Sequence, residues 1–307
     1  MNNLPDSNLA IEFNEITKRF SKINALNELS LTVKSGEIFG FLGPNGAGKT
    51  TAIRIITGFI KPTMGTVLIN GLDSWLDKEY ISQTLGFVPD NSNTFSSRSG
   101  AQLLEFWTGL QKTEPFMREE IIDRLDFPRD ALDRPVRTYS QGMMKKLNII
   151  QAFQNDPRIL VLDEPTSSLD PLVQKNFFEM LMEFKEKGAT IFMSSHALAE
   201  VEKICDRIGI IRKGKIIATE NMSSISAKYE RRMEITFADD NTPDLSSIPN
   251  VIKVVKKGNT LYLRVIGPVS AIIDKLSSYQ IQDLVFERAR LDDIFLSYYD
   301  EGKDNNA

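Results

Sequence analysis

A glycine-rich stretch, "GPNGAGKT", spans residues 43–50 and contains the residue types that bind phosphate groups. Two glycines separated by four residues let successive backbone N–H groups point at phosphate oxygens. Lys49 adds a positive charge for the β- and γ-phosphates of a nucleotide, and Thr50 offers a hydroxyl to Mg²⁺. The stretch follows an apolar strand-like run and begins a helical pattern, so the positive end of the helix faces the same phosphates. This context favours a nucleotide site over an ordinary glycine-rich turn.

A second stretch, "RILVLDEP", places two acids directly after an apolar strand-like run. Asp163 is positioned to hold Mg²⁺, often through water, and Glu164 is a candidate base that polarises an attacking water. Apolar runs that end in acids are common, so solvated acids at a strand-end turn are the alternative interpretation. The phosphate-binding stretch upstream favours the catalytic interpretation.

The chain has one histidine, His196 in "FMSSHALAEVE", and one cysteine, Cys205. A lone imidazole can be a general base, a metal ligand or a polar group at a helix end, and its immediate neighbours do not decide between these roles. Metal binding is disfavoured because there is no second histidine and Cys205 lies in an apolar helical pattern typical of a buried packing residue. A single cysteine also excludes an internal disulfide framework and fits a reducing compartment.

Composition limits the partners of this 307-residue chain. Its net charge of −4 and pI of about 5.4 give no basic field for DNA or RNA, so no nucleic-acid partner is expected. The N-terminus lacks a signal-peptide pattern, and the longest apolar runs are far shorter than a membrane span. We therefore expect no direct membrane span, although the chain can still bind a protein that spans the membrane.

Short β-type runs alternate with longer helical patterns up to about residue 220. This alternation predicts an α/β fold in which helices cover both faces of a mostly parallel sheet. One helix has clear end signals, with Asp170 as N-cap, Pro171 at the first helical position and Gly188 just past the end. We expect strands over 36–43, 158–164 and 188–195, helices over 49–58, 170–188 and 196–207, and a hairpin over 208–220 that turns at Lys213 and Gly214.

The character of the sequence changes after about Ser226, where a small α+β module begins. Its expected elements are three strand-like runs within 233–267, a helix over 269–279, a strand over 282–289 and a last helix over 291–299. The predicted divisions are a flexible N-terminus (1–9), a main domain (10–225), a C-terminal domain (226–300) and a disordered tail (301–307), with a linker near 221–230.

The four stretches "GPNGAGKT", "YSQGM", "LVLDEPTSSLD" and "SSH", in this order, resemble the ATP-binding cassette of ABC transporters over about residues 10–225. From Lys49 to Ser140 is 91 positions, from Ser140 to Glu164 is 24, and from Glu164 to His196 is 32. The resemblance implies a P-loop NTPase cassette with a RecA-like core and mostly parallel sheet, an antiparallel β subdomain and a helical subdomain over about 92–158. A small C-terminal α+β domain follows it.

The resemblance also implies a role for each motif residue. Phe20 matches the aromatic that stacks on adenine, with a core aromatic as the alternative, and His196 matches the residue that hydrogen-bonds the γ-phosphate from the side opposite Lys49. Ser140 and Gly142 match the signature residues that contact the γ-phosphate held by a second subunit. Asp170 ends a loop that lies between the two sites of a dimer, a role compatible with its N-cap role.

The resemblance implies four sets of site residues. The nucleotide-binding residues implied are Phe20, Ala25, Gly43, Pro44, Asn45, Gly46, Ala47, Gly48, Lys49, Thr50 and Thr51. The catalytic residues implied are Glu164, His196 and Lys49, and the signature residues are Ser140, Gln141 and Gly142. The metal ligands implied are Thr50, Asp163 and Asp90.

The chain departs from the family pattern at two places. The common signature, leucine-serine-glycine-glycine-glutamine, reads "YSQGM" here, so Gln141 and Met143 are substitutions. Asp90, in "GFVPDNSN", stands where most family members carry a glutamine that touches Mg²⁺ and the attacking water. A carboxylate can also ligate Mg²⁺, so we assign Asp90 to the metal site; a solvated loop acid is the alternative interpretation.

The resemblance implies ATPase activity with ATP and Mg²⁺, a separate membrane-spanning permease as partner, and a second copy of the chain or a paralogous cassette. The run "LDDIFLSYY" resembles the tail of ATPase subunits from bacterial two-component exporters of drugs, antibiotics and lipid-linked polymers. These features predict a peripheral protein on the cytoplasmic face of a bacterial membrane that energises an exporter. The alternatives are an importer ATPase and a soluble non-transport ATPase with a regulatory or assembly role, whereas the signature stretch disfavours a small-molecule P-loop kinase.

Overall fold

The computed structural model describes residues 8–90, 97–111, 114–228 and 230–287, which form two compact units. The units divide between Thr219 and Glu220, slightly before the boundary at 225/226 that the sequence suggests. Residues 1–7 of the expected N-terminal segment, the expected helix over 291–299 and the expected tail over 301–307 lie outside the described residues.

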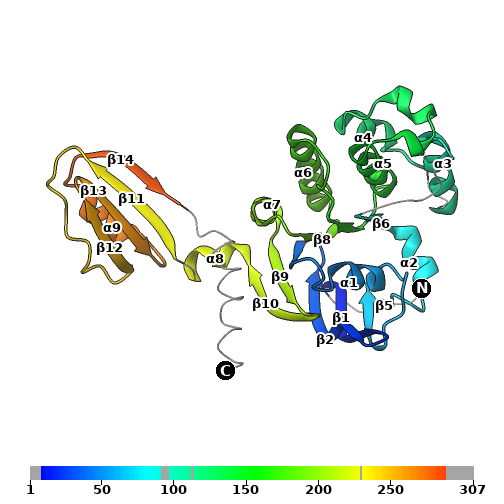
Figure 1. Cartoon of the computed structure of the whole chain (residues 1–307), viewed down its shortest axis with the longest axis horizontal. Helices are drawn as coiled ribbons and strands as arrows, with labels where there is room; N and C mark the ends of the chain where they lie inside the picture. Colours follow the sequence, from blue (N-terminus) through cyan, green and yellow to red (C-terminus); the bar gives the residue numbers. More distant parts are fainter. Residues whose placement is uncertain (1–7, 91–96, 112–113, 229, 288–307) are drawn as a thin grey trace. The chain divides into compact units, whose positions relative to one another are not determined.

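A six-stranded sheet with the order β10-β9-β3-β8-β7-β6 is the centre of the first unit (Figure 1). Every residue of β3, β7 and β8 is buried, as continuous apolar runs in a covered parallel sheet predict. Five of the strands pair in parallel, and β10 joins β9 through the expected hairpin, so the predicted mostly parallel sheet is confirmed. The strands are β3 (Ile38–Leu42), β6 (Leu85–Val88), β7 (Ile159–Asp163), β8 (Thr190–Ser195), β9 (Arg207–Arg212) and β10 (Lys215–Asn221).

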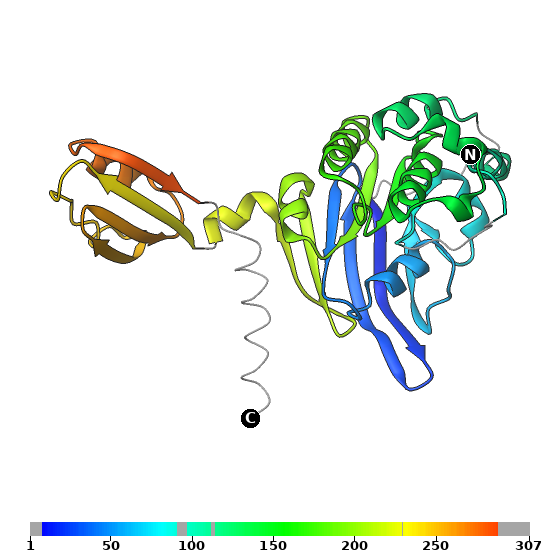
Figure 2. The same ribbon diagram turned by 45° about the horizontal axis from the view of Figure 1, so that its top comes forward.

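A second sheet, antiparallel and of order β2-β1-β4-β5, lies on the other side of helix α1. Ile53 and Ile56 of α1 belong to one core cluster with Phe13 of this sheet and with Phe41 and Phe192 of the parallel sheet. Helix α1 is therefore packed between the two sheets. In Figure 2 the long blue strands β1 and β2 run together as a hairpin. The elements are β1 (Leu9–Phe20), β2 (Ile23–Lys34), α1 (Lys49–Ile56), β4 (Met64–Ile69), β5 (Leu72–Asp73) and α2 (Lys78–Thr84).

Helices complete the first unit. Phe153 of α5 packs edge-on against Phe177 and Phe184 of α6, and α6 and α7 pack on the parallel sheet. The expected end signals of α6 are confirmed, because the Asp170 carboxylate accepts hydrogen bonds from the N–H groups of Leu172 and Val173. The helices are α3 (Gly100–Gln111), α4 (Arg118–Arg124), α5 (Gln141–Phe153), α6 (Pro171–Glu186) and α7 (Leu198–Ile204), with short 3₁₀ turns at Arg129–Asp133 and Val136–Thr138.

The second unit is a four-stranded antiparallel sheet of order β12-β13-β11-β14 with one helix on it. Ile272 and Leu276 of the helix share a small core with Ile235 and Leu263 of the sheet. The expected linker region near 221–230 contains a helix of its own, α8 (Met222–Lys228). The other elements are β11 (Arg231–Phe237), β12 (Val251–Lys257), β13 (Thr260–Val265), α9 (Ser270–Leu276) and β14 (Ile281–Phe286).

Cys205 is buried at the end of α7, as its apolar sequence pattern predicts, and burial raises the pKa of its thiol. Along the described ranges of the chain, no helix combines the length and the apolar character that a membrane span requires.

The packing of α7 on β3 generates a stability prediction at Gly40. A Cβ atom added there would lie 2.9 Å from Cys205 Sγ and 2.9 Å from Val201 Cγ1, so Gly40→Ala overpacks the core and should lower the free energy of unfolding by about 1–3 kcal/mol. Gly109, in α3, has open space around it, and Gly109→Ala should raise that free energy by about 0.5–1 kcal/mol.

Urea denaturation followed by tryptophan fluorescence measures both effects in the first unit, because Trp75 and Trp107 both belong to it. Equal stability of the Gly40→Ala and Gly109→Ala variants would contradict this account of the contact between α7 and β3.

Candidate functional site

The phosphate-binding stretch forms the turn between β3 and α1, and its glycines are required by close backbone contacts. Gly46 and Gly48 have φ angles of 79° and 114°, in the left-handed region that favours glycine. A Cβ on Gly48 would lie 2.6 Å from the Ala25 carbonyl oxygen, and one on Gly43 would lie 2.6 Å from that of Ile211. These contacts fix the loop and place Ala25, which the resemblance assigns to nucleotide binding, against Gly48.

A hairpin turn supports this loop from behind, through contacts that the sequence analysis did not predict. The Gly214 N–H donates to the Ala47 carbonyl at 2.9 Å, and the Asn27 N–H donates to the Gly214 carbonyl at 2.9 Å. Lys213 and Gly214 have φ angles of 48° and 75°, as a two-residue hairpin turn requires. The predicted position of the turn is correct. Its hydrogen bond to the phosphate loop was not expected from the sequence.

Lys49, Glu164 and His196 meet in one line of contacts. Lys49 is only 6% exposed, and its Nζ lies 2.6 Å from the Gly43 carbonyl oxygen and 3.3 Å from Glu164 Oε1. Glu164 Oε2 lies 2.8 Å from His196 Nδ1, and because a carboxylate only accepts, a hydrogen bond here needs the proton on Nδ1. The three residues predicted as catalytic are thus in contact although they are far apart in the chain.

His196 differs from its sequence expectation in one respect. The sequence suggests a helix over 196–207, but α7 covers only Leu198–Ile204, and His196 lies in the loop after β8. Its side chain is 66% exposed, so the face that does not contact Glu164 is open to a ligand. The expected helix is too long because Asp206 is held by the Ile38 N–H and Lys185, and Arg207 already belongs to β9.

Asp163 and Thr50 also meet, at the buried end of β7. Asp163 is 3% exposed; its Oδ1 accepts a hydrogen bond from Ser194 Oγ at 2.6 Å, and the Thr50 hydroxyl bonds the same carboxyl group. Burial raises the pKa of Asp163, and these two hydrogen bonds oppose that rise. Ser194 Oγ also accepts from the Glu164 N–H at 3.1 Å, so one serine positions both acids, a role that the sequence analysis missed.

The oxygen donors at this point fit Mg²⁺ bound together with a nucleotide. Thr50 and Asp163 supply one hydroxyl and one carboxylate, and Mg²⁺ typically takes one or two carboxylates and completes its shell with phosphate oxygens and water. Within the part of the chain that the structure describes, no group of three or more His, Cys, Asp and Glu side chains is arranged to hold a metal ion by itself. Asp90, just after β6, is near enough that its charge raises the pKa of Asp163.

The signature residues contact the loop that ends at Asp170. Ser140 caps α5, and its Oγ accepts from the Met143 N–H at 3.2 Å. A Cβ on Gly142 would lie 2.7 Å from the Ser168 carbonyl oxygen, whereas Gln141 is exposed and its Oε1 lies 3.5 Å from Ser168 Oγ. The N-terminal end of α5 therefore presents Ser140 and Gln141 at the surface.

The remaining predicted nucleotide residues lie at the surface or in the first turn of α1. Phe20 is 45% exposed, so it is not a core aromatic, and Lys18 Nζ lies 5.0 Å from the centre of its ring. Pro44 and Asn45 are exposed, and Thr51 is half-buried in α1.

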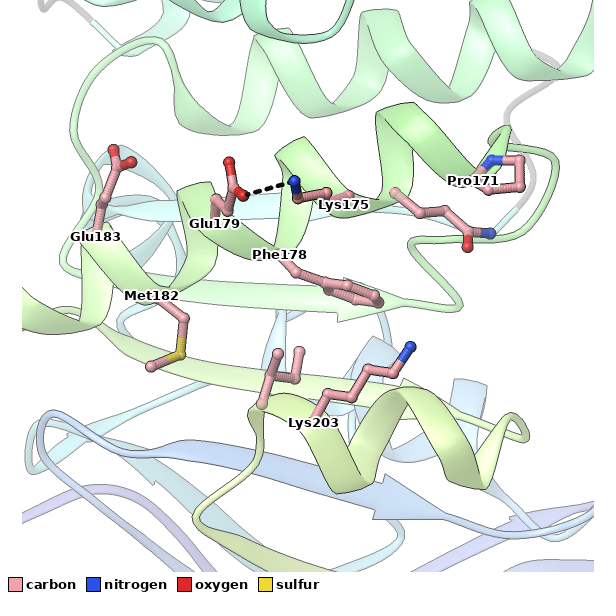
Figure 3. Close-up of a pocket in the computed structure, with 9 residues that line it drawn as sticks. Pro171, Lys175, Phe178, Glu179, Met182, Glu183 and Lys203 are labelled. Atoms are coloured by element: carbon pink, nitrogen blue, oxygen red, sulfur yellow. Dashed lines mark ion pairs between the residues drawn. The ribbon is translucent and has the colours of Figure 1, made fainter.

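A groove between α6 and α7 lies apart from these residues (Figure 3). Phe178 and Met182 of α6 face Lys203 of α7 across it, and Ile204 of α7 also lines it. None of the nucleotide, signature or metal residues lines this groove, so it is not the nucleotide site.

Comparisons with known proteins agree with the geometry. The family model described as ABC transporter matches residues 26–167. An ABC transporter ATP-binding protein of Nostoc is 39% identical over 66% of this chain and 62% of its own length. YhcH, an ABC transporter ATP-binding protein of Bacillus subtilis, is 32% identical over 96% of this chain and 97% of its own length. The bacitracin transport ATP-binding protein BcrA of Bacillus licheniformis is 32% identical over 75% of this chain and 76% of its own length.

The solved structures include the ATP-binding subunit of an ABC transporter, which superposes with a TM-score of 0.65 at 27% identity and covers 70% of this chain and 91% of that one. The similarity to YhcH extends over nearly the whole of both chains, so it includes both structural units. The chain therefore belongs to the ABC transporter family, as an ATP-binding and ATP-hydrolysing protein.

Proposed function

We propose that the chain binds Mg²⁺-ATP between two head-to-tail cassettes and uses its hydrolysis to energise a separate membrane permease that exports a drug, antibiotic, lipid or polymer. The contact line Lys49–Glu164–His196 beside the phosphate loop is the observation that supports this most strongly. It joins an anion-binding cation, a candidate base and an exposed imidazole beside the loop, and these groups can bind phosphate oxygens and orient water for phosphoryl transfer.

Glu164 acts as the base that orients water. Its carboxylate is nearly buried between Lys49 and His196, and its backbone N–H is held by Ser194. Lys49 then balances charge on the β- and γ-phosphates, and the loop N–H groups bind their oxygens. His196 contacts the γ-phosphate through Nε2, the ring nitrogen that does not contact Glu164. If the imidazole donates hydrogen bonds to Glu164 and to phosphate at the same time, both ring nitrogens must carry a proton.

Mg²⁺ neutralises phosphate charge when bound and would be held by Thr50, Asp163 and Asp90. Phe20 stacks on adenine, and its exposed ring supports this role. Ser140, Gln141 and Gly142 close over the nucleotide of the partner cassette, since the capped end of α5 offers a hydroxyl and a helix N-terminus to an anion.

A set of exposed apolar side chains, Phe59, Leu76 and Tyr80, supports docking of a permease. Phe59 packs against Phe87 of β6, the strand that leads to Asp90. Leu76 lies just before α2 and Tyr80 lies within it, and α2 contacts β6. Exposed apolar patches of this kind commonly mark protein contacts. The permease places the chain peripherally on the cytoplasmic face of a bacterial membrane. Similarity to the bacitracin transport protein BcrA and to the linearmycin resistance protein LnrL supports an exporter over an importer, since moving an antibiotic out of the cell confers resistance.

Glu164→Gln tests the base. The amide keeps the shape of the side chain but cannot take a proton, so kcat should fall by about 10²–10⁴-fold while ATP still binds. Phosphate release gives kcat, and equilibrium binding of ATP gives the affinity. Glu186→Gln, an exposed acid at the end of α6, is the matched control and should behave as wild type. Wild-type turnover in Glu164→Gln would exclude Glu164 as the base.

His196→Ala tests the imidazole. Loss of its contact with the γ-phosphate should lower kcat by at least about tenfold, with ATP binding nearly unchanged because Lys49 and the loop remain. Steady-state kinetics at saturating Mg²⁺-ATP measure this. If turnover stays intact, the assignment of His196 to phosphate is wrong.

Affinity capture of the full chain from detergent-solubilised membranes tests the permease. A polytopic membrane protein should co-purify and should stimulate ATP turnover, and the Leu76→Asp, Tyr80→Asp double variant should weaken capture without changing ATP affinity. Capture of soluble proteins alone, with full ATPase activity, would instead favour the regulatory or assembly role.

A further inference from the structure

Lys145 is a buried cation of α5 that none of the motif assignments uses. It is 3% exposed, and it lies five positions after the N-cap Ser140. Its Nζ donates to three backbone carbonyls, those of Pro89 at 2.9 Å, Asp90 at 3.0 Å and Glu164 at 3.0 Å. All three ammonium hydrogens therefore have an acceptor, and the acceptors come from two segments far apart in the sequence.

A buried lysine lowers the stability of a fold unless hydrogen bonds and nearby negative charges compensate the desolvation of its ammonium group. Burial lowers the pKa of the Lys145 ammonium, and the charges of Asp90, Asp163 and Glu164 oppose this change. A buried aliphatic side chain would avoid the desolvation of a cation. The Lys145 cation lies near three acids of the site, and it bonds the backbone carbonyls of two of them, Asp90 and Glu164.

The loop at Glu164 needs such support. Glu164 has a φ of 46°, a left-handed conformation that is strained for a residue with a side chain. Its N–H is held by Ser194, and its carbonyl is held by Ser167 Oγ at 2.8 Å and by Lys145 at 3.0 Å. The peptide groups on both sides of the Glu164 Cα are thus fixed, and this fixes the direction of its carboxylate.

We propose that Lys145 is a positioning residue for ATP hydrolysis, which holds the loops of Asp90 and Glu164 in one geometry and joins both to the signature helix α5. This inference rests on the proposed reaction at Glu164. Because α5 carries Ser140, a movement of α5 when the partner's nucleotide binds is transmitted through one ammonium group to the acids that serve the chain's own nucleotide.

Lys145→Met is the primary test, with Lys146→Met as the matched control. Lys146 is the next residue of the same helix, and its Nζ bonds the Asp126 carbonyl in an exposed contact. Both variants therefore remove one charge from α5, but only Lys145→Met removes the contacts to the carbonyls of Pro89, Asp90 and Glu164. Displacement of the Glu164 carboxylate should lower kcat about 10²-fold, as small misplacements of catalytic groups do. The KM for Mg²⁺-ATP should stay within about threefold, because the phosphate loop is untouched.

Lys145→Arg keeps the cation and should recover kcat to within about tenfold of wild type, whereas a purely packing role would not depend on charge. If Lys145→Met does not fold, as judged by its circular dichroism and melting transition, Lys145→Gln replaces it with the same expected split between kcat and KM. A variant that folds and keeps wild-type kcat, or that loses affinity and kcat in proportion, overturns the proposal.

Backbone hydrogen exchange of the nucleotide-free protein gives a readout that does not need turnover. The amide of Asp90 after β6 and those of Glu164, Thr166 and Ser167 after β7 should exchange faster in Lys145→Met than in wild type or Lys146→Met. Unchanged exchange in both segments would contradict the proposal that Lys145 holds the two loops together. Absence of ATPase activity in the wild-type chain would count against the proposed function. Faster exchange in Lys145→Met would still support the role of Lys145 in holding the loops.

Discussion

The buried acids at the end of β7 impose the main electrostatic constraint on this protein. Asp163 is almost fully buried and Glu164 nearly so, and uncompensated carboxylates in such a position are strongly unfavourable. The chain compensates them with two lysines from two different helices: Lys49 at the start of α1 and Lys145 in α5. The two lysines therefore hold the loop before α1, the end of β7 and the signature helix α5 in contact with one another.

The same constraint explains why the site suits a metal-bound nucleotide. In the structure Lys49 contacts the Glu164 carboxylate, so phosphate groups that arrive at the loop share its charge with an acid. Bare phosphates would add negative charge beside Asp90, Asp163 and Glu164. Thr50 and Asp163 would hold a divalent cation whose charge would offset that repulsion, and Glu164 would then remain available to act on water. The charge distribution therefore supports the proposed Mg²⁺ in the same way as the donor atoms do.

Sequence reasoning predicted the parallel sheet, the phosphate loop and the caps of α6 because each depends on local rules of residue type and spacing. It also brought Lys49, Glu164 and His196 together, through a resemblance and not through geometry. It did not find Ser194 or Lys145, since a serine in a strand and a lysine in an amphipathic helix have no local mark of their tertiary contacts. The overlong helix at 196–207 has the same cause: Asp206 is fixed by the distant Ile38 and Lys185.

The unusual signature "YSQGM" can be interpreted from the same contacts. A Cβ on Gly142 would lie 2.7 Å from the Ser168 carbonyl oxygen, so packing within one chain requires a glycine here. The position of Gln141 is exposed and meets no such limit, and its amide instead approaches Ser168 Oγ. Substitution at 141 therefore leaves the cap, the helix start and the loop contact of α5 in place. The substitution changes the exposed surface at the start of α5. There the amide side chain of Gln141 stands where the common signature has the hydrogen atom of a glycine, next to Ser140.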